Sequence, residues 1–169
     1  TKKATEPSNS MWRIGDTYNV SIGQGGVKVT PLQMAAVTAA IANGGLLYKP
    51  YVLEALLDKE GNAVEKTEPK IIREGMVGHS PLEEVKKGMA GTVTYGTARI
   101  LRDLPVSVGA KTGTAQAGAG LPHAWITAFA PLENPEIAIV VMVERAGEGS
   151  TVAAPITREI MNWYFTHRK

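Results

Sequence analysis

The sequence of 169 residues contains no cysteine and no run of about 18 consecutive apolar residues. Without cysteine, the chain has neither a disulfide framework nor a thiolate metal site. Its polar beginning, residues 1–7, has the pattern of neither a signal peptide nor a membrane anchor. Because it starts with Thr1 instead of methionine, we expect a processed or truncated chain.

An excess of charge of one sign is also absent. Lysine and arginine total 18 against 16 acidic residues, and no basic run is interleaved with aromatic side chains, so we expect no nucleic-acid partner. His79, His123 and His167 have no ligand-type spacing, which indicates surface or capping histidines and no metal site. The remaining composition, 44% hydrophobic and 20% charged, is typical of one globular domain.

Two glycine-rich nucleotide-binding patterns are missing as well. A phosphate-binding loop needs glycine directly before Lys-Ser/Thr, but Ala110 precedes Lys111. A dinucleotide fingerprint that began at Gly23 would need its third glycine where Lys28 stands. The sequence therefore predicts no nucleotide cofactor, and we expect no cofactor of any kind.

Capping boxes predict two helices. The first box, Thr30–Gln33 with proline at its first helical position, predicts a helix over 30–43 that ends at the glycine pair 44–45. The second box, Ser80–Glu83, predicts a helix over 81–91. The side chains expected to face inward from this second helix are Leu82, Val85 and Met89.

The remaining peripheral segments are predicted from composition and periodicity. We expect a loop or linker over 1–15, a short extended piece over 18–22, and a peripheral hairpin with strands over 51–57 and 63–67. A last helix is predicted over 152–165. The apolar stripe that this helix is expected to lay on a sheet consists of Ile156, Ile160, Trp163 and Tyr164.

Three β-prone runs near the C-terminus predict an antiparallel meander. They span 106–116, 124–131 and 137–144 and are joined by short connections. The run Ile137–Val143 is apolar on both faces, so we expect a central strand with helices above and below it. This pattern indicates an α+β fold.

The first of these strands contains the most informative stretch, residues 109–116, Gly-Ala-Lys-Thr-Gly-Thr-Ala-Gln. It places a lysine, two hydroxyls and a glycine on an extended segment, which is the chemistry of a carboxylate-binding strand. Lys-Thr-Gly is the third motif of serine penicillin-recognising enzymes. On the tripeptide alone, a polar turn at the end of a buried strand remains an alternative interpretation.

The segment Ser21–Gly45 carries a more specific pattern, Gly-Gln-Gly followed by Thr-Pro-Leu-Gln-Met. It closely resembles the segment before the Lys-Thr-Gly strand in class B penicillin-binding proteins, and is most similar to the elongation type, penicillin-binding protein 2. The resemblance runs from about Gly15 to the C-terminus. It implies a penicillin-binding, serine β-lactamase-like transpeptidase fold, in which a five-stranded antiparallel sheet has helices on both faces and the Lys-Thr-Gly strand forms the edge of the cleft.

Two other motifs of that family are missing from the sequence. None of the six serines is followed by lysine three residues later or by asparagine two residues later. These serines are Ser8, Ser10, Ser21, Ser80, Ser107 and Ser150. The resemblance also places the first two strands of the sheet upstream, beside the last strand. We therefore interpret residues 1–169 as the C-terminal part of a single transpeptidase domain.

The resemblance assigns roles to residues of the Lys-Thr-Gly strand. Lys111 and Thr114 are expected to be catalytic, Lys111 through its charge and contact with the proton-transfer network, and Thr114 through its backbone N–H as an oxyanion donor. The hydroxyls of Thr112 and Thr114 are expected to bind the substrate carboxylate. Gly113 is expected to let the substrate backbone approach the strand closely.

The function that the resemblance implies is part of a peptidoglycan D,D-transpeptidase, which cross-links stem peptides through a serine acyl-enzyme and binds penicillin. The chain alone is expected to be inactive. Expected partners are stem peptides, β-lactams, the upstream half of the domain and a membrane glycosyltransferase. The expected location of the parent protein is the outer face of the bacterial cytoplasmic membrane. The alternative is a non-catalytic β-lactam-sensing or peptide-binding domain of the same fold; a serine β-lactamase is disfavoured because no base for the hydrolytic water is found.

Overall fold

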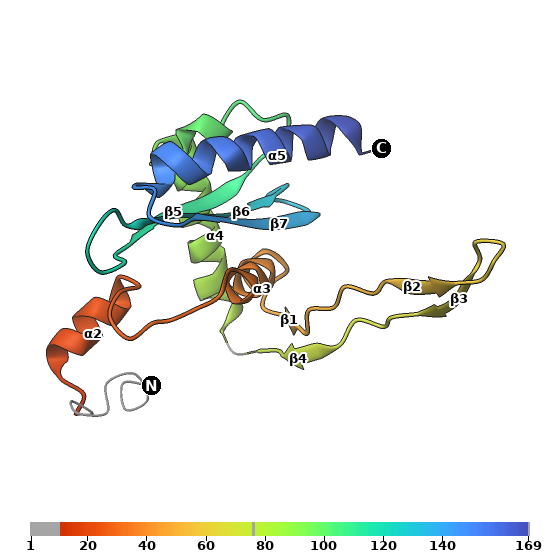
Figure 1. Cartoon of the computed structure of the whole chain (residues 1–169), viewed down its shortest axis with the longest axis horizontal. Helices are drawn as coiled ribbons and strands as arrows, with labels where there is room; N and C mark the ends of the chain where they lie inside the picture. Colours follow the sequence, from red (N-terminus) through yellow and green to blue (C-terminus); the bar gives the residue numbers. More distant parts are fainter. Residues whose placement is uncertain (1–10, 76, 169) are drawn as a thin grey trace.

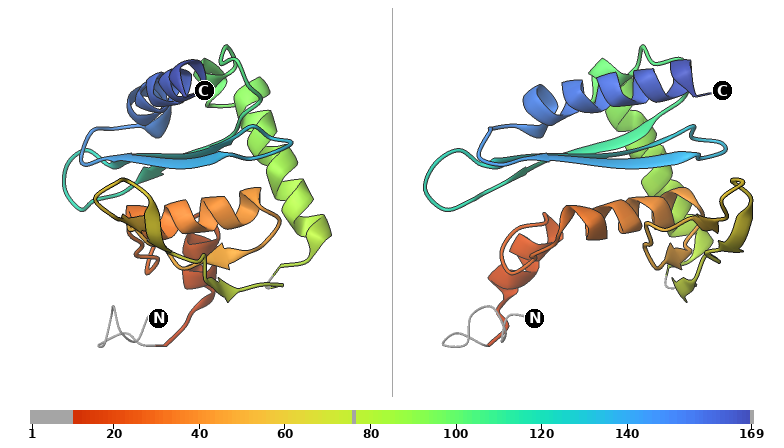
Figure 2. Two further views of the ribbon diagram at one scale, coloured as in Figure 1. Left: turned by 90° about the vertical axis from the view of Figure 1, so that its right-hand side faces the viewer. Right: turned by 45° about the vertical axis from the view of Figure 1, so that its right-hand side comes forward.

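The computed structural model describes residues 11–75 and 77–168 (Figure 1). A three-stranded sheet lies between helix α5 (Ala154–His167) on one face and helix α3 (Pro31–Ala42) on the other (Figure 2). Helix α4 (His79–Thr94) crosses beside the sheet, and a long two-stranded arm projects away from it (Figures 1 and 2). The predicted α+β class, with an antiparallel sheet and helices on both faces, is confirmed.

The sheet is the predicted antiparallel meander. Its strands β5 (Gly109–Ala115), β6 (His123–Ala130) and β7 (Ile137–Val143) follow one another in that order across the sheet. Thr112 pairs with Ile126 in the register between β5 and β6. Consecutive strands with short connections pair as hairpins, which explains why the sequence predicts this part of the fold well.

Strand β7 differs from its prediction, because it lies at one edge of the three-stranded sheet and not at the centre. All seven of its residues are half-buried. Helices α3 and α5 both pack against it, so its two apolar faces reflect the helix on each side of the sheet. Helices can cover both faces of an edge strand as well as of a central strand. The apolar pattern of β7 therefore does not determine its position in the sheet.

Helix α5 follows a π-helical turn, Gly149–Ala153, and its existence over most of 152–165 is confirmed. The predicted stripe is wrong for Ile156, Ile160 and Trp163, which are 40%, 43% and 61% exposed. The residues that α5 buries are Ala154, Thr157 and Met161. Both sets have spacings of three and four residues, so periodicity does not distinguish them. The buried set packs on a face of β6 that carries alanines, where small side chains allow a close approach.

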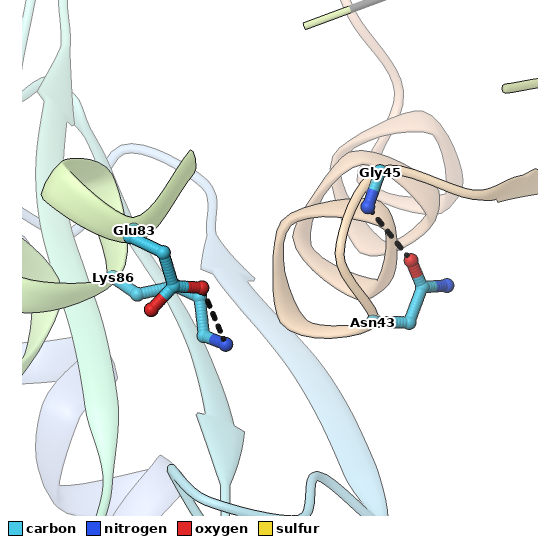
Figure 3. Close-up of polar contacts among 4 residues, drawn as sticks. All are labelled: Asn43, Gly45, Glu83 and Lys86. Carbon is cyan, nitrogen blue, oxygen red and sulfur yellow. Dashed lines mark hydrogen bonds and ion pairs between the residues drawn. The ribbon is translucent and has the colours of Figure 1, made fainter. Parts of the chain in front are cut away.

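Helix α3 begins and ends where the sequence predicts. The Thr30 hydroxyl accepts from the Gln33 N–H at 3.2 Å, and the Gln33 side chain accepts from the Thr30 N–H at 2.9 Å. The helix is followed by Gly44 and Gly45, whose φ angles of 86° and 109° lie in the left-handed region that favours glycine. The Gly45 N–H donates to the Asn43 side chain at 3.2 Å, which closes the end of the helix (Figure 3).

Helix α4 starts two residues earlier than predicted and continues to Thr94. Its N-cap is Gly78, with no side-chain cap, so the predicted capping box at Ser80 is wrong. Leu82 and Met89 are buried as predicted, but Val85 is 45% exposed. The earlier start places Glu83 in the second turn, where it forms an ion pair with Lys86 at 3.3 Å (Figure 3).

The N-terminal region contains an additional helix. The extended piece predicted over 18–22 is wrong, because helix α2 spans Ile14–Ser21. The Asp16 carboxylate accepts from the Arg13 N–H at 2.7 Å and so starts the helix by local hydrogen bonding, which hydrophobic pattern does not reveal. Most of the loop predicted over 1–15 lies outside the described residues; α2 already includes its last two positions.

The arm between α3 and α4 contains the predicted peripheral hairpin, formed by β2 (Ala55–Leu57) and β3 (Ala63–Lys66). At its base, β1 (Leu47–Tyr48) pairs antiparallel with β4 (Ile71–Arg73), a pairing that the sequence does not predict. Within residues 11–75 and 77–168, no helix is both long and apolar enough to cross a membrane.

Candidate active site

Strand β5 forms an edge of the sheet, with β6 on one side and no strand on the other among the described residues. Its side chains alternate between the two faces. Ala110 belongs to the core cluster under α5, so Thr112 and Thr114 share the α5 face. Lys111 and Gly113 lie on the opposite face, which α3 covers. The strand therefore brings together all four predicted site residues and divides them between its two faces.

The outer edge of β5 exposes particular backbone groups. Lys111 Nζ donates to the Thr112 carbonyl, and Gln24 Nε2 donates to the Thr114 carbonyl at 3.1 Å. In an antiparallel strand the N–H and C=O of one residue point to the same side, and the side alternates along the chain. The N–H groups of Thr112 and Thr114 therefore also point outward, away from β6.

Lys111 is exposed and lies opposite Thr127 of β6. Thr127 is not a free hydroxyl, because its Oγ1 lies 2.9 Å from the Oγ1 of the buried Thr38 of α3. The Thr38 hydroxyl also donates to the Met34 carbonyl at 2.8 Å. This bonded pair ties α3 to the sheet next to Lys111.

The two threonines of the strand differ in their surroundings. Thr112 is only 9% exposed, and its Oγ1 lies 2.6 Å from Thr97 Oγ1. Thr97 stands in the turn after α4 and is exposed. The Thr114 side chain is also exposed, and its hydroxyl has no hydrogen-bond partner within the described part of the chain. The α5 face of β5 thus presents one free hydroxyl and one hydroxyl pair.

Gly113 lies where backbone elements crowd together. A Cβ added to Gly113 would lie 3.3 Å from the Trp125 Cβ on the α3 face. On the other face, a Cβ added to Gly149 would lie 2.5 Å from the Gly113 carbonyl oxygen. The π-helical turn therefore packs directly on the backbone of the Lys-Thr-Gly segment and supports it from the α5 side.

Two residues of this site, Gln24 and Thr97, were not among the predicted site residues. Gln24 belongs to the Gly-Gln-Gly pattern that carries the resemblance, so the sequence contains a signal for it. Thr97 lies 15 positions before Thr112 and shows no comparable signal. The described chain contains no group of three or more His, Cys, Asp or Glu side chains that could hold a metal ion.

Comparison with known proteins places the whole chain in one family. The model of the penicillin-binding protein transpeptidase domain matches residues 3–162. The chain is 36% identical to the peptidoglycan D,D-transpeptidase MrdA of Haemophilus influenzae over 93% of its own length and 27% of that protein. It is 35% identical to PbpA of Mycolicibacterium smegmatis over 82% of its own length and 30% of that protein.

Solved structures give the same result. Penicillin-binding protein A of M. tuberculosis, as an imipenem acyl-enzyme complex, is 33% identical with a TM-score of 0.75, over 87% of this chain and 33% of that one. Pseudomonas aeruginosa PBP2, in complex with WCK 5153, is 31% identical with a TM-score of 0.79, over 99% of this chain and 36% of that one. The chain spans about a third or less of the curated relatives that it matches, and it belongs to the penicillin-binding protein transpeptidase family.

Proposed function

We propose that this chain is part of a peptidoglycan D,D-transpeptidase and contributes the Lys-Thr-Gly strand to its active site. The observation that carries the proposal is the outer edge of β5, where the exposed side chains of Lys111 and Thr114 lie beside outward N–H groups. Its relatives are named peptidoglycan D,D-transpeptidases, and one similar structure is an acyl-enzyme with imipenem.

The reaction is an acyl transfer in two steps. A serine oxygen attacks the penultimate D-alanine carbonyl of a stem peptide, the amide C–N bond breaks, and D-alanine leaves with a proton. An amine of a second stem peptide then attacks the ester carbonyl, the ester C–O bond breaks, and the proton lost by the amine returns to the serine oxygen. In both steps negative charge develops on the carbonyl oxygen, so preorganised donors at that position lower the barrier.

The residues of β5 supply three parts of this chemistry. The N–H of Thr114 is one oxyanion donor. Lys111 supplies positive charge on the α3 face, in contact with the proton-transfer network. The hydroxyls of Thr112 and Thr114 bind the terminal carboxylate of the donor peptide. Gly113 has no side chain to obstruct an approaching peptide, so that an extended peptide can lie along the edge of β5 by strand addition.

The nucleophile comes from outside these residues, because no serine here has the activating lysine three positions later. We assign it to an upstream half of the same domain. That half would add its strands to β7, whose outer edge has no partner strand among the described residues. The intact enzyme would act at the outer face of the cytoplasmic membrane of the bacterial envelope, anchored in that membrane, with a glycosyltransferase as partner.

The proposal is tested by acylation of the intact transpeptidase domain. Lys111→Ala should slow acylation by penicillin on the order of 10²-fold, because a preorganised electrostatic contact of this kind is worth about 3 kcal/mol or more. Thr112→Val and Thr114→Val keep the β-branched shape that a strand favours but remove a hydroxyl. Each should lower acylation efficiency about ten- to a hundredfold, from a lost hydrogen bond to a carboxylate of about 1.5–3 kcal/mol.

The carboxylate supplies the control for the threonines. Their effects should shrink for the methyl ester of the same penicillin, which lacks the charge that the hydroxyls bind. A matched control protein is Thr94→Val, since the Thr94 hydroxyl donates to the Ala90 carbonyl inside α4 at 3.0 Å. Thr127→Val is unsuitable as a control because it breaks the contact with buried Thr38. Unchanged acylation in the Lys111 variant, within about threefold, would refute the assignment.

A further inference from the structure

The Gly-Gln-Gly loop after α2 has no role in the function proposed above. Its glycines, Gly23 and Gly25, have φ angles of 76° and 70°, in the left-handed region. The N–H groups of Gly23 and Gln24 donate to carbonyls at the end of α2 at 2.9 and 2.8 Å. The loop therefore folds back onto the helix, and the backbone of Gln24 is held between two turns.

The side chain of Gln24 reaches strand β5. It is half-buried, whereas the residues on either side of it are exposed. Its Nε2 donates to the Thr114 carbonyl at 3.1 Å, across 90 positions of sequence. This contact lies at the outer edge of β5, one residue before the strand ends at Ala115.

We propose that Gln24 is a positioning residue for acyl transfer, which holds the backbone of Thr114 through its carbonyl. The inference rests on the proposed function of β5, in which the Thr114 N–H is an oxyanion donor. That N–H and the carbonyl that Gln24 holds belong to the same residue and point to the same side. An oxyanion donor acts only within about 2.7–3.1 Å of the developing charge, so small shifts of this residue cost rate.

The end of β5 needs such support. No neighbouring strand pairs with its outer edge among the described residues, and the loop that follows contains Gly118 and Gly120, both with positive φ. A strand end with one paired edge opens more easily than a strand paired on both sides. The carboxamide of Gln24 replaces the missing neighbour at the last outward carbonyl.

A competing role is a gate, in which Gln24 occupies the carbonyl that a peptide N–H uses and must leave before the substrate binds. The two roles predict opposite changes in acylation when the Gln24 side chain is replaced. A positioning residue speeds acylation, so its removal slows the reaction. A gate opposes binding, so its removal would strengthen binding and raise acylation efficiency.

The test uses two near-isosteric substitutions in the intact transpeptidase domain. Gln24→Met keeps the length of the side chain but removes its donor. It should lower the acylation rate constant for penicillin about three- to tenfold, as expected for one neutral hydrogen bond, and change the affinity of the noncovalent complex less than twofold. Gln24→Glu places an ionised carboxylate against the Thr114 carbonyl. It should be slower still at neutral pH and recover as the pH falls through the pKa of the new carboxyl, because the protonated acid donates again.

Two further variants complete the experiment. Ile22→Ala truncates an exposed side chain of the same loop and should leave acylation within about twofold of the parent. Lys111→Ala reports separately on the proposed function. If Lys111→Ala slows acylation and Gln24→Met does not, the inference about Gln24 alone is wrong. If neither slows it, the proposed function of β5 is wrong. Faster acylation in Gln24→Met would overturn the positioning role in favour of a gate. A pH profile of Gln24→Glu that matches the parent's would overturn it in favour of no role.

Discussion

Gly149 offers a severe test of how the π-helical turn supports the Lys-Thr-Gly strand. A Cβ at this position would lie 2.0 Å from the Trp125 carbonyl oxygen and 2.5 Å from the Gly113 carbonyl oxygen. Both obstacles are backbone atoms of paired strands, so no side-chain rotation relieves the contact. Gly149→Ala therefore forces the turn away from the sheet or distorts β5 and β6.

The expected cost follows from this geometry. Overpacking a well-packed core typically costs about 1–3 kcal/mol, and a clash with two backbone oxygens belongs at the upper end, ~3 kcal/mol. For a chain of this size a destabilisation of 1 kcal/mol lowers the Tm by about 2–4 °C, which gives about 6–12 °C for Gly149→Ala. Because the Gly113 carbonyl is one of the two obstacles, acylation in the intact domain should fall as well.

Thermal unfolding, followed by circular dichroism, measures the effect, and Gly88→Ala is its matched control. Gly88 lies within α4, and a Cβ there would meet no atom within 4 Å. Alanine in a helix interior is favoured over glycine by about 0.5–1 kcal/mol, so this variant should melt slightly above the parent. If Gly149→Ala melts within about 1 °C of the parent, the turn does not pack on the backbone of β5 and β6.

Two more outcomes are expected. The isolated, folded 169-residue chain should form no covalent adduct with a fluorescent penicillin, because none of its serines has the activating lysine, and an adduct detected by gel fluorescence would contradict the assignment of the nucleophile to an upstream half. Ser107 Oγ donates to the Glu133 carboxylate at 2.6 Å and holds the pKa of that carboxyl below its ordinary value. The contribution to stability is therefore present above the unfolded pKa and lost as the pH falls through the lower folded pKa. Ser107→Ala should raise the Glu133 pKa measured by NMR titration; an unchanged value would refute this cause.

The elements that the sequence predicted well are those fixed by local chemistry. Helix α3 has a proline and a reciprocal capping box at its start and two left-handed glycines after its end, so its bounds depend on few distant contacts. The meander of β5, β6 and β7 follows from short connections between β-prone runs. For these segments local preference and the tertiary fold agree.

The predictions that failed depended on information outside the local pattern. Two stripes of α5 have the same helical spacing, and the alanine-lined face of β6 decides which of them is buried. Residues 80–83 match the sequence pattern of a capping box, but α4 already begins at His79. The segment over 18–22 contains β-prone residues, yet the helix that begins at Ile14, with the Asp16 carboxylate accepting from the Arg13 N–H, continues to Ser21.

The candidate site shows the same division. Lys111, Thr112, Gly113 and Thr114 are consecutive, so the sequence could place them on one strand edge. The partners of this strand are 15 and 90 positions away, at Thr97 and Gln24, and only the packing of α4 and of the loop after α2 brings them to β5. The Gly-Gln-Gly pattern draws attention to Gln24, but neither it nor any local pattern shows that Gln24 and Thr97 contact β5.

The hydroxyl pair on β5 determines how the threonine variants are interpreted. Thr97 and Thr112 have two O–H protons between them, and one proton fills the 2.6 Å contact that joins them, so the pair has a single proton left to offer a carboxylate. Thr112→Val removes that pair. Its effect on acylation therefore includes the loss of a direct contact between Thr112 and the carboxylate and the loss of the hydrogen bond with Thr97. Thr114 has an exposed hydroxyl without a partner within the described residues, so Thr114→Val removes one contact only. A carboxylate-dependent loss at Thr114 is thus the simpler evidence for anion binding at this strand, and a larger loss at Thr112 indicates that the hydroxyl pair of Thr97 and Thr112 acts as one unit.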